Sequence, residues 1–87
     1  MRYVELVETL LRLTHYWTYE PLAEVCVRLT PDLRQPLDEG HAHRLVWQAI
    51  RDAAANRAQL IAVANVVLAV MLGWEGAPIL TEEDVVL

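Results

Sequence analysis

Apolar residues recur along this chain at the spacing of an α-helix. From Arg2 to about Thr14, apolar positions fall three and four residues apart with charged positions between them, a periodicity that predicts an amphipathic helix. The same periodicity predicts helices over 19–29, 41–55 and 58–72. The positions expected to face a core in the first three are Tyr3, Leu6, Val7, Leu10, Leu11, Thr14, Leu22, Val25, Cys26, Leu29, Ala42, Leu45, Val46, Ala49, Ile50, Ala53 and Ala54.

Residues that cap or break helices divide the rest of the chain. A threonine and a proline predict a short helix over Pro31–Gln35, and Asn56 is placed where a left-handed residue would join two helices. Thr81 followed by three acids predicts the start of a last short helix. The expected fold is all-α: a compact five- to six-helix bundle. Residues 1–87 would form a single domain, with 74–87 as a tail or a truncated last helix.

The segment from Leu60 to Leu72 is apolar apart from Asn65. A membrane-spanning helix needs about 20 apolar residues, and this segment is too short, so no membrane span is expected. The favoured interpretation is the central helix of a bundle, apolar on all sides because neighbours surround it. The alternative is a helix buried in an oligomer. In either case the Asn65 side chain needs an internal hydrogen-bond partner.

Composition narrows the class of protein. The net charge is −5 and all seven basic residues are arginines, so the chain should repel phosphate backbones and nucleic acid is not an expected partner. The single cysteine, Cys26, excludes an intrachain disulfide and fits a reducing, cytoplasmic location. Glu5 and Glu8 interrupt the apolar start, so no secretory signal is expected there.

No group of residues predicts catalytic chemistry. His41 and His43 are two residues apart at a helix start and would point in different directions, which does not suit a metal site. Cys26 lies on an apolar stripe, where cysteine behaves as a small hydrophobe. The glycines are isolated and form no phosphate loop. We therefore expect no enzyme activity, no cofactor and no metal.

Two charged sets are candidates for a protein interface. One is the outer face of the helix over 41–55, and the other is acidic and lies near the loop before it. Opposite charges on separate surfaces suit head-to-tail self-association, whereas the simpler interpretation is a solvated surface. The sets are Arg44, Gln48 and Arg51, and Asp32, Asp38 and Glu39. Trp17, Trp47 and Trp74 are each either core residues or interface anchors.

Between Thr18 and about Val66 the spacing resembles that of effector-associated, bacterial death-like domains. The matching residues are Tyr19-Glu20-x-Leu22-x-x-Val25, Leu33-x-x-x-Leu37, Leu45-Val46-x-x-x-Ile50-x-x-Ala53 and Asn56-Arg57-x-x-Leu60-Ile61-x-x-Ala64. The resemblance implies a death-fold-like bundle of six helices. It also implies an adaptor that recruits partners by like-with-like contacts in a prokaryotic defence or signalling system.

Two functions therefore compete. The first is a non-catalytic adaptor that docks to a protein partner, either a copy of itself or a like domain, and forms homo-oligomers. The second is a small obligate helical dimer, such as a regulatory subunit or an antitoxin-like inhibitor, buried through Val63, Val67 and Val70 of the apolar helix.

Overall fold

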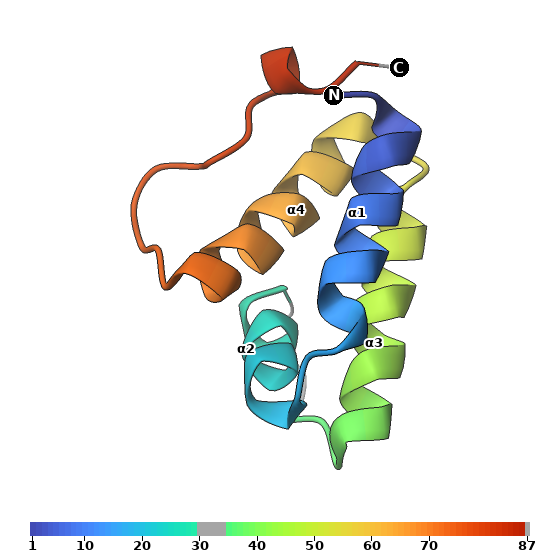
Figure 1. The fold of residues 1–87 in the computed structure, drawn as a ribbon, viewed down its shortest axis with the longest axis vertical. Helices are drawn as coiled ribbons and strands as arrows, with labels where there is room; N and C mark the ends of the chain where they lie inside the picture. Colours follow the sequence, from blue (N-terminus) through green and yellow to red (C-terminus); the bar gives the residue numbers. More distant parts are fainter. Residues whose placement is uncertain (30–34, 87) are drawn as a thin grey trace.

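The computed structural model describes residues 1–29 and 35–86. The described residues form four α-helices and one short 3-10 turn, η1 (Figure 1). Their bounds are α1 Tyr3–His15, α2 Tyr19–Leu29, α3 Glu39–Ala53, α4 Arg57–Leu72 and η1 Glu82–Asp84. The short helix predicted over Pro31–Gln35 falls, except for its last residue, outside the described part of the chain, and Gln35 itself is not helical.

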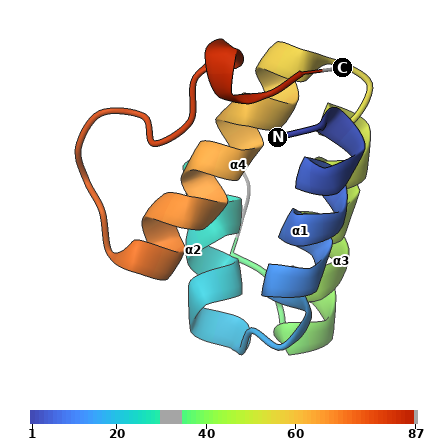
Figure 2. The ribbon, with the colours of Figure 1, turned by 45° about the horizontal axis from the view of Figure 1, so that its top comes forward.

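The helices α3 and α4 form the centre of the arrangement. They pack against each other, and both α1 and α2 pack against the two of them. Viewed with the top of the molecule turned forward, the segment after α4 passes over the bundle to the start of α1 (Figure 2). The all-helical class predicted from the sequence is confirmed. The predicted number of helices is not, because the described residues contain four α-helices where five or six were expected.

The predicted apolar stripes form the core. Leu10, Leu22, Val46 and Ile50 are fully buried, and so is Leu60 of α4. Residues at the edges of the stripes, such as those at 7, 11, 29 and 45, are partly buried and pack against this cluster. Helical periodicity therefore identified which side of α1, α2 and α3 faces inward.

Side-chain caps fix the starts of α3 and α4. Asp38 accepts a hydrogen bond from the His41 amide at 2.8 Å, so α3 begins at Glu39, two residues before the predicted start. Asn56 accepts from the Gln59 amide at 3.2 Å and has φ −142° and ψ 123°. The expectation of a left-handed residue at Asn56 is therefore wrong. Its side chain caps the following helix, a role for which asparagine is strongly preferred, and the backbone stays extended.

The apolar helix α4 is covered along only part of its length. Leu60, Ala64 and Val67 are fully buried, but near its end Met71 is 43% and Leu72 is 63% exposed. The expectation that neighbours surround it on all sides is therefore wrong, because Ala58, Gln59 and Ala62 near its start are exposed as well. Among the described residues, no helix is long and apolar enough to cross a membrane.

A tail after α4 covers one side of that helix. Gly73, with φ 64°, ends α4 in the left-handed conformation that glycine adopts without strain. Further on, the Asn65 side chain donates to the Leu80 carbonyl at 2.9 Å and accepts from the Leu80 amide at 2.7 Å. The predicted internal partner of Asn65 is therefore the backbone of the tail. This pair of bonds holds the tail against α4.

The end of the tail closes onto α1. Val85 is fully buried, and Val86 forms a parallel bridge with Arg2, in which the Tyr3 amide donates to the Val86 carbonyl at 2.7 Å. That bond satisfies one of the amides that the start of α1 leaves without a helical partner. The predicted last helix is limited to the three residues of η1, because the chain must become extended to bury Val85.

The turn before Val85 is fixed by one carboxylate. Asp84 accepts from the Thr81 amide at 2.8 Å and from the Thr81 hydroxyl at 3.1 Å. The backbone bond, followed by the hydroxyl bond, lowers the pKa of Asp84 below its ordinary value. A carboxylate with a lowered pKa in the folded state stabilises that state above its ordinary pKa, and the contribution disappears as the pH falls through the lowered value.

We expect the Val85→Ala substitution to lower the free energy of unfolding by about 2 kcal/mol, because it leaves a cavity in the core. The matched control is Val86→Ala at the neighbouring position, where the side chain is 52% exposed and the effect should be close to zero. Urea unfolding monitored by circular dichroism measures both. Equal midpoints for the two variants would show that the tail contributes nothing to the core.

The Asn65→Ala substitution should lower the free energy of unfolding by about 1 to 3 kcal/mol, because two backbone groups of Leu80 lose their partners. It should also speed hydrogen exchange at the Leu80 amide more than at amides of α2. Gln59→Ala, on the exposed side of the same helix, is the control and should leave both quantities nearly unchanged. Unaltered exchange at Leu80 in the Asn65 variant would contradict this role.

Candidate functional site

An aromatic cluster lies where the end of α1 meets α3. The His15 ring stacks on Trp47, with 5.7 Å between the ring centroids and 26° between the planes. His43, one turn before Trp47 on α3, meets the same indole edge-on at 6.2 Å. The guanidinium of Arg51, one turn later, lies 5.9 Å from the centroid of that indole, within the range of a cation–π contact. Tyr16 follows His15 and is 84% exposed.

These residues surround an open hollow on the surface. His15, His43, Arg44 and Trp47 line a volume of about 250 Å³. Among the described residues, Arg44 and Arg51 form no ion pair, whereas Arg28 pairs with Glu24 and Arg57 with Glu82. We call the six residues of this region the cationic-aromatic face: His15, Tyr16, His43, Arg44, Trp47 and Arg51.

Packing holds the Trp47 ring in place. Its indole nitrogen is buried and has no hydrogen-bond acceptor among the described residues. The ring is therefore positioned by His15, His43 and Arg51, which contact it from two helices. A Trp fixed in this way presents a rigid apolar wall beside two cations.

The structure places the three predicted interface residues of α3 on its exposed side, but they do not act together. Arg44 lines the hollow beside Trp47. Gln48 donates to Asp52 at 2.8 Å and lines a separate hollow that also includes Leu45. Arg51 lies over the Trp47 ring. The arginines therefore belong to the cationic-aromatic face, whereas Gln48 turns away from it.

The acidic set lies on the same helix as these arginines. Asp38 is the N-cap of α3 and Glu39 is its first residue, and both are exposed. Asp32 lies outside the described residues. Capping fixes Asp38 at the start of this helix, whereas the arginines lie on its later turns.

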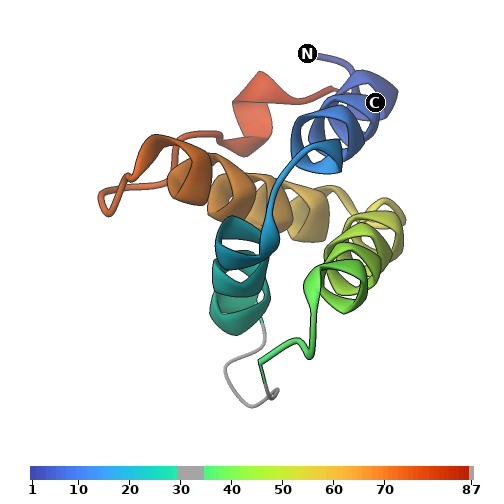
Figure 3. The same cartoon turned by 60° about the horizontal axis from the view of Figure 1, so that its bottom comes forward.

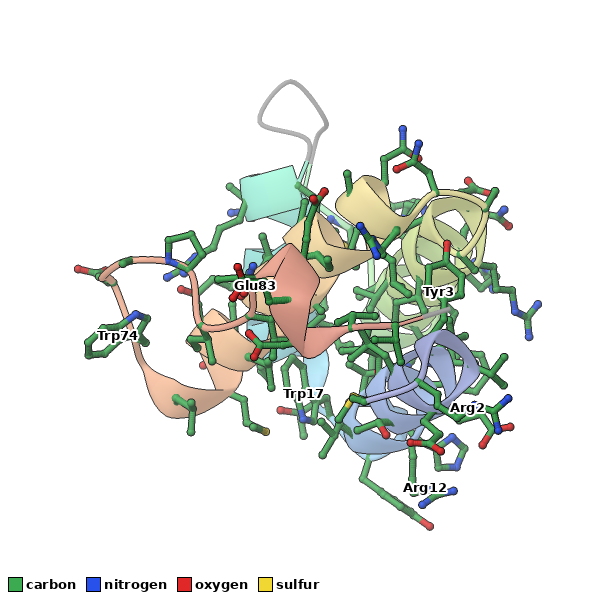
Figure 4. All side chains as sticks on the ribbon, turned by 90° about the horizontal axis from the view of Figure 1, so that it is seen from above. Arg2, Tyr3, Arg12, Trp17, Trp74 and Glu83 are labelled. Carbon is green, nitrogen blue, oxygen red and sulfur yellow. The ribbon has the colours of Figure 1, made fainter. Side chains whose placement is uncertain are left out.

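The three tryptophans have three different environments. Trp17 is partly buried against the core and Trp47 belongs to the cationic-aromatic face. Trp74 is 49% exposed on the loop after α4, and Figure 4 shows it at one edge of the molecule, far from Arg12 at the end of α1. The sequence alone did not distinguish these environments, since Trp17 and Trp74 both flank turns.

The residues considered for catalysis lie apart. His41 sits in the first turn of α3, where its Nδ1 accepts from the Leu37 amide at 3.0 Å, and His43 belongs to the hollow. Cys26 is buried in the core, and burial raises the pKa of its thiol. In the described part of the chain, no three histidine, cysteine or acidic residues come together in a way that could hold a metal ion.

The dimer surface predicted on α4 is not available. Val63 is 8% exposed and Val67 is fully buried within this chain's own core, and Val70 is partly buried against it. The prediction of a dimer buried through these three residues is therefore wrong. The large apolar residues that are exposed on this helix are at its end, where Met71 and Leu72 precede the loop that carries Trp74.

Part of the cationic-aromatic face was detectable in the sequence. His43, Trp47 and Arg51 are spaced four residues apart and must share one side of a helix. The contribution of His15 was not detectable, because it depends on how α1 packs against α3. The conformation of the loop around Trp74 depends on hydrogen bonds that no residue pattern specifies.

Comparison of this chain with protein-family models, with curated proteins and with solved structures gives no match in any of the three. The function therefore has to be argued from the site itself.

The thiol of Cys26 should react very slowly with an aromatic disulfide reagent at neutral pH, because burial and a raised pKa reduce both access and thiolate. In urea the same thiol should react at the rate of a small-molecule thiol. Following the absorbance of the released thiolate with and without denaturant measures the ratio. Equal rates in the two conditions would show that the thiol is accessible in the folded chain.

Proposed function

We propose that this chain is a non-catalytic protein-interaction domain that acts as an adaptor by like-with-like docking. The single observation that carries the proposal is the cationic-aromatic face, in which an ordered Trp adjoins two arginines without ion-pair partners among the described residues. Tryptophan, tyrosine and arginine are the residues that contribute most to binding energy at protein interfaces.

The charge of the molecule favours a protein partner at this face. The whole chain carries −5, yet the cationic-aromatic face has two arginines, two histidines and no acid among its six members. A second acidic copy would be attracted to such a face, which steers association and fixes its orientation. A shallow surface of this kind suits a protein better than a small molecule, which requires a deeper cavity.

The described hollows are small as well as open. Four of them measure about 190 to 340 Å³, at or below the lower end of the range for small-molecule sites, about 300 to 1,000 Å³. The residues considered for catalysis do not converge in any of them. These features favour docking over catalysis. The spacing that resembles bacterial death-like domains supports placing the adaptor in a prokaryotic defence or signalling system.

We expect Arg51→Glu to weaken self-association roughly tenfold, because it reverses a charge at the proposed contact and removes the cation from the Trp47 ring. Light scattering across protein concentration, at low and high salt, measures the effect. Association of the unaltered chain should weaken as salt rises, since exposed charges are screened.

Arg2→Glu is the matched control, because it makes the same change of charge at an exposed position at the start of α1. It should leave association within twofold of the unaltered chain. A chain that is monomeric at every concentration, or equal effects of the two substitutions, would contradict like-with-like docking through this face.

A further inference from the structure

The loop after α4 holds the Trp74 side chain in one orientation at the surface. The Trp74 amide donates to Ala69 at 2.9 Å as α4 ends, and the indole N–H donates to the Ala77 carbonyl, also at 2.9 Å. The ring lies directly against Gly76, where an added Cβ would come within 2.3 Å of it. Although 49% of Trp74 is exposed, these contacts fix its rotamer. The side chain would therefore lose little conformational entropy on binding.

The surroundings of Trp74 complete a projecting knob. Met71 and Leu72 are 43% and 63% exposed beside it on the last turn of α4. Glu75, the next residue, is exposed and adds one carboxylate. Exposed apolar side chains grouped in this way mark contact surfaces. We call Met71, Leu72, Trp74 and Glu75 the Trp74 knob.

The cationic-aromatic face has the complementary properties. Its hollow of about 250 Å³ is almost wholly apolar in lining and is walled by Trp47 with the rings of His15 and His43. That volume is suited to one large aromatic side chain, which aromatic walls can stack against. Arg44 lines the hollow and Arg51 lies over the Trp47 ring, so either guanidinium is placed to pair with a carboxylate that enters beside the ring.

The knob and the hollow lie on opposite sides of the molecule. With the bottom of the bundle turned forward, the loop after α4 projects from one side and α3 lies on the other (Figure 3). The view from above also places Trp74 at the edge away from α1 (Figure 4). One copy therefore cannot fill its own hollow. A contact between the two features joins different copies head to tail and leaves a free knob and a free hollow at the ends.

From these observations we infer that the Trp74 knob of one copy docks into the hollow of the cationic-aromatic face of a second copy. Trp74 enters the hollow that the rings of His15, His43 and Trp47 bound, and Glu75 pairs with Arg44 or Arg51. The inference rests on the proposed function, because it specifies the surface that the cationic-aromatic face binds. It makes the assembly a head-to-tail series of copies rather than a two-fold symmetric pair.

Complementation between two variants tests this geometry. Trp74→Ala removes the aromatic side chain of the knob, and Arg44→Glu reverses a charge at the hollow. Because both side chains are exposed, we expect both variants to fold. Each variant alone should associate at least about 30-fold more weakly than the unaltered chain, the effect of losing a hot-spot residue. Mixed in equal amounts, they should form a 1:1 heterodimer that grows no further, since one intact knob and one intact hollow remain. Sedimentation velocity measures these species.

Two further variants test whether association requires the observed orientation of the Trp74 ring, and not only a tryptophan at this position. Gly76→Ala should displace the ring and weaken association while the tryptophan is retained. Leu37→Ala removes an apolar side chain that is 88% exposed elsewhere and should change nothing. Circular dichroism confirms that each variant is folded.

The outcomes distinguish this inference from the proposed function. If Trp74→Ala assembles like the unaltered chain, or if the mixture gives no heterodimer, the knob is not the occupant and the inference is wrong. If Arg51→Glu still weakens association roughly tenfold in that case, the proposed function stands with another occupant. A chain that stays monomeric throughout contradicts both.

Discussion

The two hydrogen bonds between the Asn65 side chain and the Leu80 backbone fix the position of the tail on α4, and the C-terminal structure depends on them. An apolar helix must be covered, and the packed helices leave part of the α4 surface exposed, including Ala58 and Ala62 as well as Met71 and Leu72. An asparagine on that helix satisfies both polar groups of one extended residue, which no apolar side chain could do. Because Leu80 is held there, the chain reaches the first helix, buries Val85 and pairs with Tyr3.

The attachment of the tail to α4 also restricts the loop that carries Trp74. The tail leaves the helix at Gly73 and returns to it at Leu80, so the six residues between them form a loop of restricted span. Within that loop the hydrogen bond from Trp74 to Ala77 and the contact with Gly76 determine how the indole is presented. The exposed tryptophan is thus a consequence of the way in which the tail is anchored to the core.

Helical periodicity was sufficient to predict most of the fold. It identified four amphipathic or apolar segments and the inward side of the first three, because burial is the main determinant of such patterns. For α4 it indicated no inward side. It failed where side chains cap the backbone of a helix. Capping by Asp38 places the start of α3 before the predicted residue, and Asn56 caps α4 instead of adopting a left-handed conformation. The candidate site was only half predictable. Spacing along one helix groups Trp47 with Arg51, but the stacking of His15 is a tertiary contact that needs the packed structure.

The pairing of the first residues with Val86 has a consequence for how the unit can be carried by a larger protein. Because the Val86 amide donates to the Met1 carbonyl at 2.9 Å, Met1 and Val86 lie side by side at one end of the bundle (Figure 1). His15 lies at the far end of a helix of 13 residues, about 20 Å away at the usual rise. A host protein could therefore accept this unit within a surface loop, or be fused at either end, and leave His15 and Trp47 unobstructed.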